Sequence, residues 1–142
     1  MKFLTTTASN QTFLNIALFA VRVFVGFAMI SHGYPKLQKL TNGEEIQFMD
    51  FLGLGATTTL CLVVFAEFIG SIFLILGLFS RFFLAVLTFT MMIAALVAHG
   101  GDPFSKMESS LLYLSIYILL LATGPGKFSI DAMINKRRES RW

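Results

Sequence analysis

Charged residues are scarce in this chain, and long apolar runs take their place. Only 13% of the 142 residues are charged, whereas 56% are hydrophobic. A soluble domain of this size and composition would expose far too much apolar surface to water, so the composition excludes an ordinary soluble globular protein. We therefore expect most of the chain to lie in a lipid bilayer.

Cysteine is almost absent, and the common signatures of enzyme sites are missing. Cys61 is the only cysteine, which excludes an internal dithiol cycle, and we interpret it as apolar filler. The sequence has no Gly-rich nucleotide loop, no His-Glu-x-x-His zinc helix and no Gly-x-Ser-x-Gly elbow. His32 and His99, even with Asp102 and Glu108, form no specific metal-binding pattern, so we expect no metal site. Whether the protein is an enzyme stays open at this stage.

Four apolar stretches approach the length that crosses a bilayer. A spanning helix needs about 20 residues, and backbone groups in hydrocarbon must be hydrogen-bonded within their own segment, which favours helices. The sequence therefore predicts an all-α, integral membrane four-helix bundle that forms one domain over residues 1–142. The predicted spans cover residues 13–31, 56–79, 82–99 and 108–123.

Residues 33–55 form the only long connection, which we expect on the outer side of the membrane. We place the start of this connection at residue 33 because Tyr34-Pro35 is expected to end the first helix. Its later part is apolar, and we expect this part either to lie among the lipid headgroups or to cap the outer mouth of the bundle. These apolar residues are Ile46, Phe48, Met49, Phe51 and Leu52.

Basic residues are distributed unevenly between the two sides of the predicted bundle. The side with both termini holds seven basic residues: Lys2, Arg81, Lys127, Lys136, Arg137, Arg138 and Arg141. The last five belong to a basic tail over residues 127–142. The other side holds Lys36, Lys39, Lys106 and the acids Glu44, Glu45, Asp50, Asp102 and Glu108. The positive-inside rule then predicts that both termini and the tail are cytoplasmic. We interpret the net charge of +3 as orientation and anionic-lipid contact, and expect no nucleic-acid partner.

Two charges fall inside the predicted spans, Arg22 in the first and Glu67 in the second. A lone ion at the bilayer centre costs roughly 3 kcal/mol on insertion scales. Because consecutive spans run in opposite directions, we expect the two charges to meet at the same depth as an ion pair. Such a pair either serves a functional site or only specifies helix packing.

Further polar side chains are predicted to form a ligand-binding cleft in the outer half of the bundle. A His-Gly pair closes each outward-going helix, and two tyrosines one turn apart share a face of the fourth helix. The simpler interpretations are helix capping or headgroup contact for the histidines and packing for the tyrosines. The cleft residues are Arg22, Glu67, His32, His99, Tyr113 and Tyr117, with Lys36, Asp102 and Glu108 near the rim.

Short motifs occur within the predicted spans and at their ends. They are His32-Gly33-x-x-Lys36-Leu37, Ala66-Glu67-x-x-Gly70, Gly77-Leu78-Phe79-Ser80-Arg81, His99-Gly100, Leu111-Leu112-Tyr113-Leu114 and Thr123-Gly124-Pro125-Gly126-Lys127-Phe128-Ser129-Ile130-Asp131. Their combination resembles the DoxX family of small bacterial membrane proteins, with Lys127-Phe128 where the family often shows Arg-Tyr. The resemblance implies a four-span, multi-pass protein of the bacterial inner (plasma) membrane. It also implies a link to quinone-coupled sulfur oxidation or to redox stress, and distant relatives act in membrane-protein assembly or trafficking.

The leading functional hypothesis is a component of a quinone-linked or redox-stress system that binds a quinone or another lipid-like ligand in the outer-half cleft. No intrinsic cofactor is expected, so electrons would come from a redox partner protein or from the ligand. The alternative is a non-catalytic assembly or anchoring factor for a partner protein. A third hypothesis is a small transporter or proton path. The sequence leaves open whether the protein is a homo-oligomer.

Overall fold

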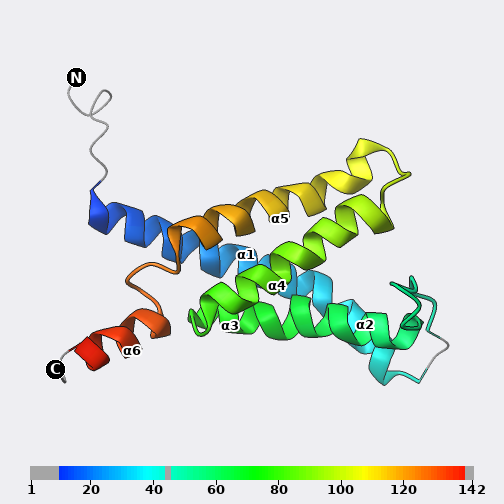
Figure 1. Ribbon diagram of the computed structural model, residues 1–142, viewed down its shortest axis with the longest axis horizontal. Coiled ribbons are helices and arrows are strands. Elements are labelled where there is room, and N and C mark those ends of the chain that lie inside the picture. Colours follow the sequence, from blue (N-terminus) through cyan, green and yellow to red (C-terminus); the bar gives the residue numbers. More distant parts are fainter. Residues whose placement is uncertain (1–9, 44–45, 140–142) are drawn as a thin grey trace.

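The computed structural model describes residues 10–43 and 46–139, and every regular element in these ranges is a helix (Figure 1). The prediction of an all-α protein is therefore confirmed. The elements are α1 (Gln11–Thr41), α2 (Ala56–Val64), η2 (Phe65–Ile69), α3 (Gly70–Leu76), α4 (Ser80–Ile93), η3 (Ala94–Ala98), α5 (Phe104–Thr123) and α6 (Ile130–Glu139). The chain termini and the charges of Lys2, Glu44, Glu45 and Arg141 lie outside the described residues.

The helices combine into four candidate membrane spans, as predicted. Because η2 and η3 are π-helical turns that continue their neighbours, α2, η2 and α3 form one rod, here called the second span, and α4 with η3 forms the third span. The spans are Gln11–Thr41, Ala56–Leu76, Ser80–Ala98 and Phe104–Thr123. Length and composition fit a bilayer crossing for each.

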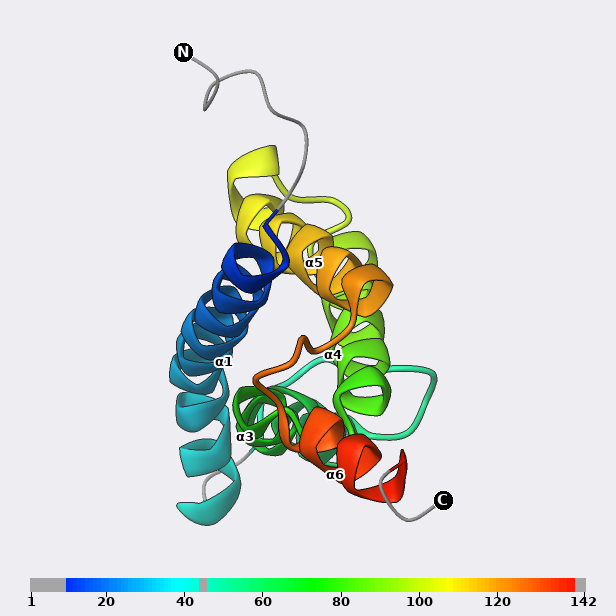
Figure 2. The same ribbon diagram turned by 90° about the vertical axis from the view of Figure 1, so that its left-hand side faces the viewer.

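Consecutive spans run in opposite directions, so the bundle has two distinct ends (Figures 1 and 2). Gln11 and α6 lie at one end, which we call the terminal end. The connections from α1 to α2 and from η3 to α5 lie at the other, which we call the loop end. That the terminal end faces the cytoplasm stays a prediction from the charges.

The core lies where all four spans meet. It is an apolar cluster of Leu18, Val25, Met29, Leu74, Leu84, Leu87, Met91, Tyr117 and Leu120. Glycines let α1 approach the second span closely: Gly26 faces Ile75, and a Cβ added at Gly33 would lie 3.0 Å from the backbone nitrogen of Phe68. Many phenylalanines point outward instead, which suits a lipid-facing surface.

The first helix does not end at Tyr34-Pro35, as the sequence pattern predicted, but continues through Pro35 to Thr41. A proline removes only its own N–H and disturbs the carbonyl one turn earlier, and helices in bilayers tolerate this when neighbouring helices hold the segment. The connection therefore begins at Asn42 rather than at residue 33. Pro35 leaves Lys36 on the helix, which determines the geometry of the site.

Candidate functional site

The predicted ion pair between Arg22 and Glu67 is wrong. A Cβ on Gly77 would lie 3.0 Å from Arg22 Cζ, whereas one on Gly33 would lie 3.2 Å from Glu67 Cβ. In this antiparallel register, the two charges are separated along α1 by about 11 residues, or roughly 16 Å. The prediction placed the two charges at the same depth in their spans, but α1 continues to Thr41, beyond the predicted span 13–31, so Arg22 lies toward the terminal end.

Arg22 instead holds the segment that follows α5. Its side chain is buried, and its guanidinium donates hydrogen bonds from Nη1 to the carbonyl of Pro125 and from Nη2 to the carbonyl of Phe128 at 2.6 Å. Asn15, nearer the start of the same helix, accepts a hydrogen bond from the backbone N–H of Lys127 at 2.9 Å. These charge-assisted and amide contacts pair backbone groups of the segment after α5 that belong to no helix, and so hold this segment against α1.

Asp131 completes this arrangement, which we call the terminal lock. Its carboxylate accepts hydrogen bonds from the backbone N–H groups of Phe79 at 2.9 Å and Ser80 at 2.8 Å, and so caps the start of α4. Its own N–H donates to the carbonyl of Gly77 at 2.9 Å. The motif Thr123–Asp131, noted in the sequence, therefore connects α1, the end of the second span and the start of α4. Its role is structural.

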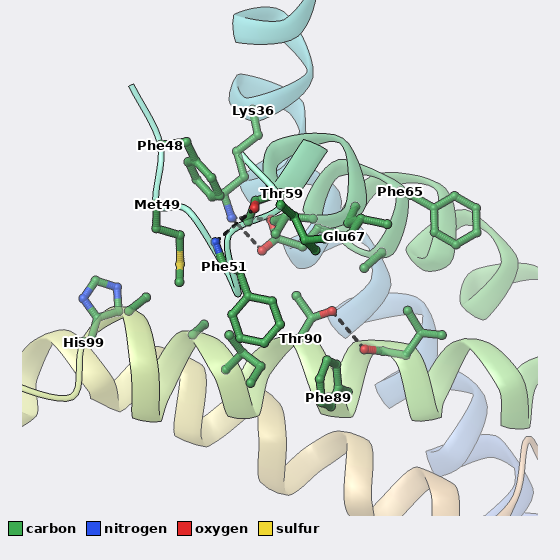
Figure 3. Close-up of a pocket in the computed structure, with 18 residues that line it drawn as sticks. Lys36, Phe48, Met49, Phe51, Thr59, Phe65, Glu67, Phe89, Thr90 and His99 are labelled. Carbon is green, nitrogen blue, oxygen red and sulfur yellow. Dashed lines mark hydrogen bonds and ion pairs between the residues drawn. The ribbon is translucent and has the colours of Figure 1, made fainter. Parts of the chain in front are cut away.

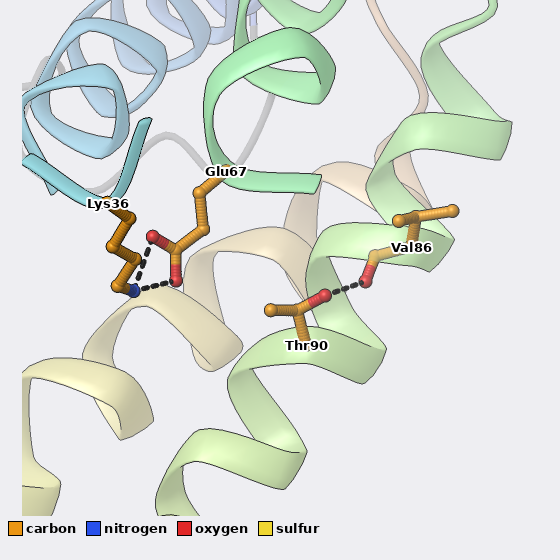
Figure 4. A network of polar contacts seen from close by, with 4 residues as sticks. All are labelled: Lys36, Glu67, Val86 and Thr90. Atoms are coloured by element: carbon orange, nitrogen blue, oxygen red, sulfur yellow. Dashed lines mark hydrogen bonds and ion pairs between the residues drawn. The ribbon is translucent and has the colours of Figure 1, made fainter. Parts of the chain in front are cut away.

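Glu67 pairs with Lys36, which sequence reasoning did not identify as its partner. Lys36 Nζ lies 2.6 Å from both carboxylate oxygens (Figure 4). Glu67 is only 3% exposed, whereas the Lys36 side chain is 30% exposed. The pair forms because Gly33 brings α1 against η2, and Lys36 follows one turn later on the same face.

A large cavity of about 570 Å³ lies beside this pair, between the second span and α4 with η3 (Figure 3). Phe48, Met49 and Phe51 of the connection line it at the loop end, so capping of the bundle mouth is the better description of this segment. Leu52, by contrast, is 81% exposed. The remaining wall is mostly apolar and includes Leu62, Val63, Phe65, Val86, Phe89 and Ile93.

Few polar groups in the large cavity are free to meet a ligand. Thr59 donates its hydroxyl to the carbonyl of Gly55 at 3.0 Å, and Thr90 donates to Val86 at 2.9 Å. Among the described residues that line the cavity, this leaves the Lys36–Glu67 pair and His99 as the groups able to bind a polar head.

A small cavity of about 170 Å³ lies on the other side of the pair. It is mainly polar, and it shares Lys36, Glu67, Ala94 and His99 with the large cavity. Its other lining residues are Met29, His32, Met91, Ser109, Ser110 and Tyr113. The His32 ring meets the Tyr113 ring edge-on, with centroids 5.7 Å apart.

His99 connects both cavities to the rim of the loop end. Its Nδ1 lies 2.9 Å from the Asp102 carboxylate, and Lys106 Nζ lies 3.6 Å from the other carboxylate oxygen. The hydrogen bond with His99, assisted by the nearby Lys106 charge, lowers the pKa of the Asp102 carboxyl below its usual value. Asp102 therefore stays ionised in neutral and mildly acidic solution and orients the His99 ring.

Both π-helical turns border the cavities. Glu67 lies in η2, and His99 follows η3 directly, where its N–H donates to the carbonyl of Ala94 at 3.1 Å. Such turns insert an extra residue into a helix and occur frequently at functional sites. Their position on facing helices marks this region as the best candidate site.

The structure brings together four of the six predicted site residues, Glu67, His32, His99 and Tyr113, around the two cavities. Arg22 belongs to the terminal lock. Tyr117 lies in the apolar core with 0% exposure, stacks on Tyr113 at 6.0 Å, and its hydroxyl has no hydrogen-bond partner among the described residues. Over residues 10–43 and 46–139, no three His, Cys, Asp or Glu side chains gather where they could hold a metal ion.

Comparisons with known proteins agree with this architecture. The DoxX family profile matches residues 17–100, a range that contains both members of the Lys36–Glu67 pair and His99. The chain is similar to "Inner membrane protein YqjF" of Escherichia coli (strain K12), with 24% identity over 129 residues, which cover 87% of this chain and 95% of the relative. No solved structure matches the chain significantly. The chain therefore belongs to the DoxX family and is a multi-pass inner-membrane protein.

Proposed function

We propose that this protein binds a lipid-soluble ligand with a polar head, a quinone in the first instance, and serves a quinone-linked or redox-stress system. The observation that carries the proposal is the mostly apolar cavity of about 570 Å³ with an ion pair in its wall, of which Glu67 is buried and Lys36 is partly exposed. Its volume lies within the roughly 300 to 1,000 Å³ that is typical of small-molecule sites, which combine an apolar lining with a few placed polar groups.

The chemistry of the wall suits a quinone head. Its carbonyl oxygens accept hydrogen bonds, and the Lys36 ammonium and the His99 ring can donate them. The phenylalanines of the lining would pack against the ring and the first part of the tail. Electrons for any reduction would come from a redox partner protein or from the ligand itself.

Ligand binding can be tested directly on protein purified in lipid nanodiscs. An organic extract of the purified protein is analysed for quinone, and the protein is then titrated with short-chain ubiquinone and menaquinone analogues. Saturable binding is expected, and excess phospholipid without quinone should not compete. His99→Ala should weaken binding about tenfold, which corresponds to the roughly 1.4 kcal/mol of one or two lost hydrogen bonds.

Two further variants separate the cavity from general packing. Ala94→Phe places a large ring where both cavities meet and should abolish binding. Tyr117→Phe is the matched control, because Tyr117 lines neither cavity and its hydroxyl has no partner among the described residues, so its affinity should equal that of the wild type. Absence of saturable quinone binding by the folded wild type would reject the proposal.

A second candidate, a non-catalytic anchoring factor for a partner protein, is favoured by a different observation. The terminal lock fixes the start of α6, on which Met133 and Ile134 are exposed beside basic residues. Lys136→Glu with Arg138→Glu should then release a co-purifying partner and leave quinone affinity unchanged. The third hypothesis, a small transporter or a proton path across the membrane, gains no comparable support, because the terminal lock occupies the terminal end of the bundle.

A further inference from the structure

We propose that Glu67 exchanges protons between a ligand in the large cavity and water at the loop end. The ligand would then belong to the class whose polar head carries an ionisable proton, such as a phenol, a hydroquinone or a hydroxyquinone. This inference rests on the proposed function, because it assumes that the large cavity holds a ligand.

The position of the Lys36–Glu67 pair between two unlike cavities carries this inference. On one side is the large cavity with its mostly apolar wall, and on the other is the small cavity, most of whose lining residues are polar. Glu67 contributes to both walls, although it is only 3% exposed. A carboxylate in this position separates a lipid-like compartment from a hydrophilic one, and among the described residues it is the only carboxylate that lines either cavity.

The small cavity provides a polar route from Glu67 toward the rim. Facing the pair are His32 on α1, Tyr113 on α5 and His99 at the end of η3. From His99 the polar contacts continue to Asp102 and Lys106 at the loop end. A volume of about 170 Å³ is large enough for several waters, at about 30 Å³ per molecule, which would connect these groups by hydrogen bonds.

The proton step balances without any oxidant or reductant. The O–H bond of the ligand head breaks, its proton binds a carboxylate oxygen of Glu67, and the head becomes an oxyanion. Protonated Glu67 no longer neutralises Lys36, so the ammonium is available to pair with the oxyanion. Glu67 then passes the proton to water in the small cavity, and the reverse sequence delivers a proton to the ligand. A head group without an ionisable proton could bind but could not take part.

The rate of proton exchange with a bound probe tests this inference. The probe is a 2-hydroxy-3-alkyl-1,4-naphthoquinone, whose neutral and anionic forms differ in visible absorbance. Protein in nanodiscs is saturated with the probe and subjected to a rapid pH jump, and the colour change is followed on a timescale shorter than probe dissociation. In the wild type we expect a fast response, and in Glu67→Gln a response at least tenfold slower.

Matched variants keep the interpretation clear. Tyr117→Phe, which lies outside both cavities, should respond like the wild type. Ser109→Leu leaves the ion pair intact and places an apolar side chain in the small cavity, so it should also slow the response by tenfold or more, and it serves where Glu67→Gln does not fold. Equal rates in the wild type and a folded, probe-saturated Glu67→Gln or Ser109→Leu variant would overturn the inference while leaving ligand binding intact. Failure of the probe and of quinones to bind at all would reject the proposed function as well.

A second measurement needs neither ligand nor variant. An apolar carbodiimide should reach Glu67 through the large cavity, and a water-soluble carbodiimide should reach it through the small one. The activated carboxyl lies beside Lys36 Nζ, 2.6 Å from each oxygen in the native pair, so an amide between the two residues should form with net loss of one water, detectable by mass spectrometry. Reaction with the apolar reagent alone would show that Glu67 is closed to water, and would overturn the inference.

Discussion

Lys36 Nζ lies 2.6 Å from each carboxylate oxygen of Glu67, so the two side chains form a two-point ion pair in the loop half of the bundle. The partners differ in their access to water, because Glu67 is 3% exposed and the Lys36 side chain is 30% exposed. A lysine with a long apolar stem can extend its ammonium toward the aqueous phase when its partner is lost. The shorter, buried glutamate cannot.

Replacing Lys36 should therefore destabilise the protein more than replacing Glu67 does. Lys36→Met leaves a buried carboxylate without its cation, which can cost roughly 3 to 5 kcal/mol, whereas replacing both partners by apolar residues of similar size can be nearly neutral. In thermal unfolding of the purified protein, we expect the largest loss for Lys36→Met, a smaller loss for Glu67→Leu, and a double variant more stable than Lys36→Met alone. Lys39→Met, at an exposed position in the last turn of α1, should change little. Equal losses in the two single variants would contradict the asymmetry.

The course of α1 shows how far the sequence could predict this site. Arg22, Gly26, Met29 and Gly33 recur at alternating steps of four and three residues, and the next step lands on Lys36. These five residues lie along one face of α1, so the periodic pattern already contained Lys36, the correct partner of Glu67. The prediction missed it because the local rule that proline ends a helix was given more weight than the continuing periodicity, whereas packing against η2 overrides that rule in the folded bundle.

Other features of the site depend on tertiary packing that no local pattern encodes. The four spans follow from apolar length alone. The π-helical turns at Glu67 and before His99, however, involve apolar segments whose residues give no sign of an inserted residue. The partners of Arg22 are backbone carbonyls far along the chain, and such acceptors carry no sequence signal. The polar and charged side chains could be predicted as candidates, but pairing Arg22 with Glu67 by their expected depth failed.

The terminal lock predicts that Arg22 and Glu67 act independently on stability. Arg22→Met leaves the carbonyls of Pro125 and Phe128 without their charged donor, and the loss of a hydrogen bond to a charged group costs about 1.5 to 3 kcal/mol. Because the two charges do not touch, the losses from Arg22→Met and Glu67→Leu should add within about 0.5 kcal/mol in the double variant. Hydrogen exchange should increase in residues 124–129 for Arg22→Met and remain unchanged there for Glu67→Leu. If the double variant loses less free energy of unfolding than the sum of the two single losses, Arg22 and Glu67 are directly coupled and this prediction fails.

Gly77 should tolerate no side chain. Its φ is +69°, and an added Cβ would lie 2.6 Å from Ser129 Cβ, so Gly77→Ala combines a left-handed backbone with a clash against the segment that carries Asp131. We expect a loss of about 1 to 3 kcal/mol in the free energy of unfolding. Gly101→Ala is the matched control, since an added Cβ there meets nothing within 4 Å. If Gly77→Ala unfolds at the wild-type temperature, the lock does not constrain this turn.

The excess of basic residues at the terminal end predicts that this end is cytoplasmic. Asn42 follows α1 at the loop end and Asn135 belongs to α6 at the terminal end, and both are exposed, so each can be replaced by cysteine in a Cys61→Ala background; α6 and the loop end lie at opposite ends of the bundle (Figure 1). Cys61 must be removed because it is itself exposed. In intact spheroplasts, an impermeant maleimide should label Asn42→Cys and spare Asn135→Cys, and both should react after the membrane is disrupted. Labelling of Asn135→Cys alone in intact spheroplasts would show that the orientation is the opposite of the predicted one. The small polar cavity would then open to the cytoplasm rather than to the outer face.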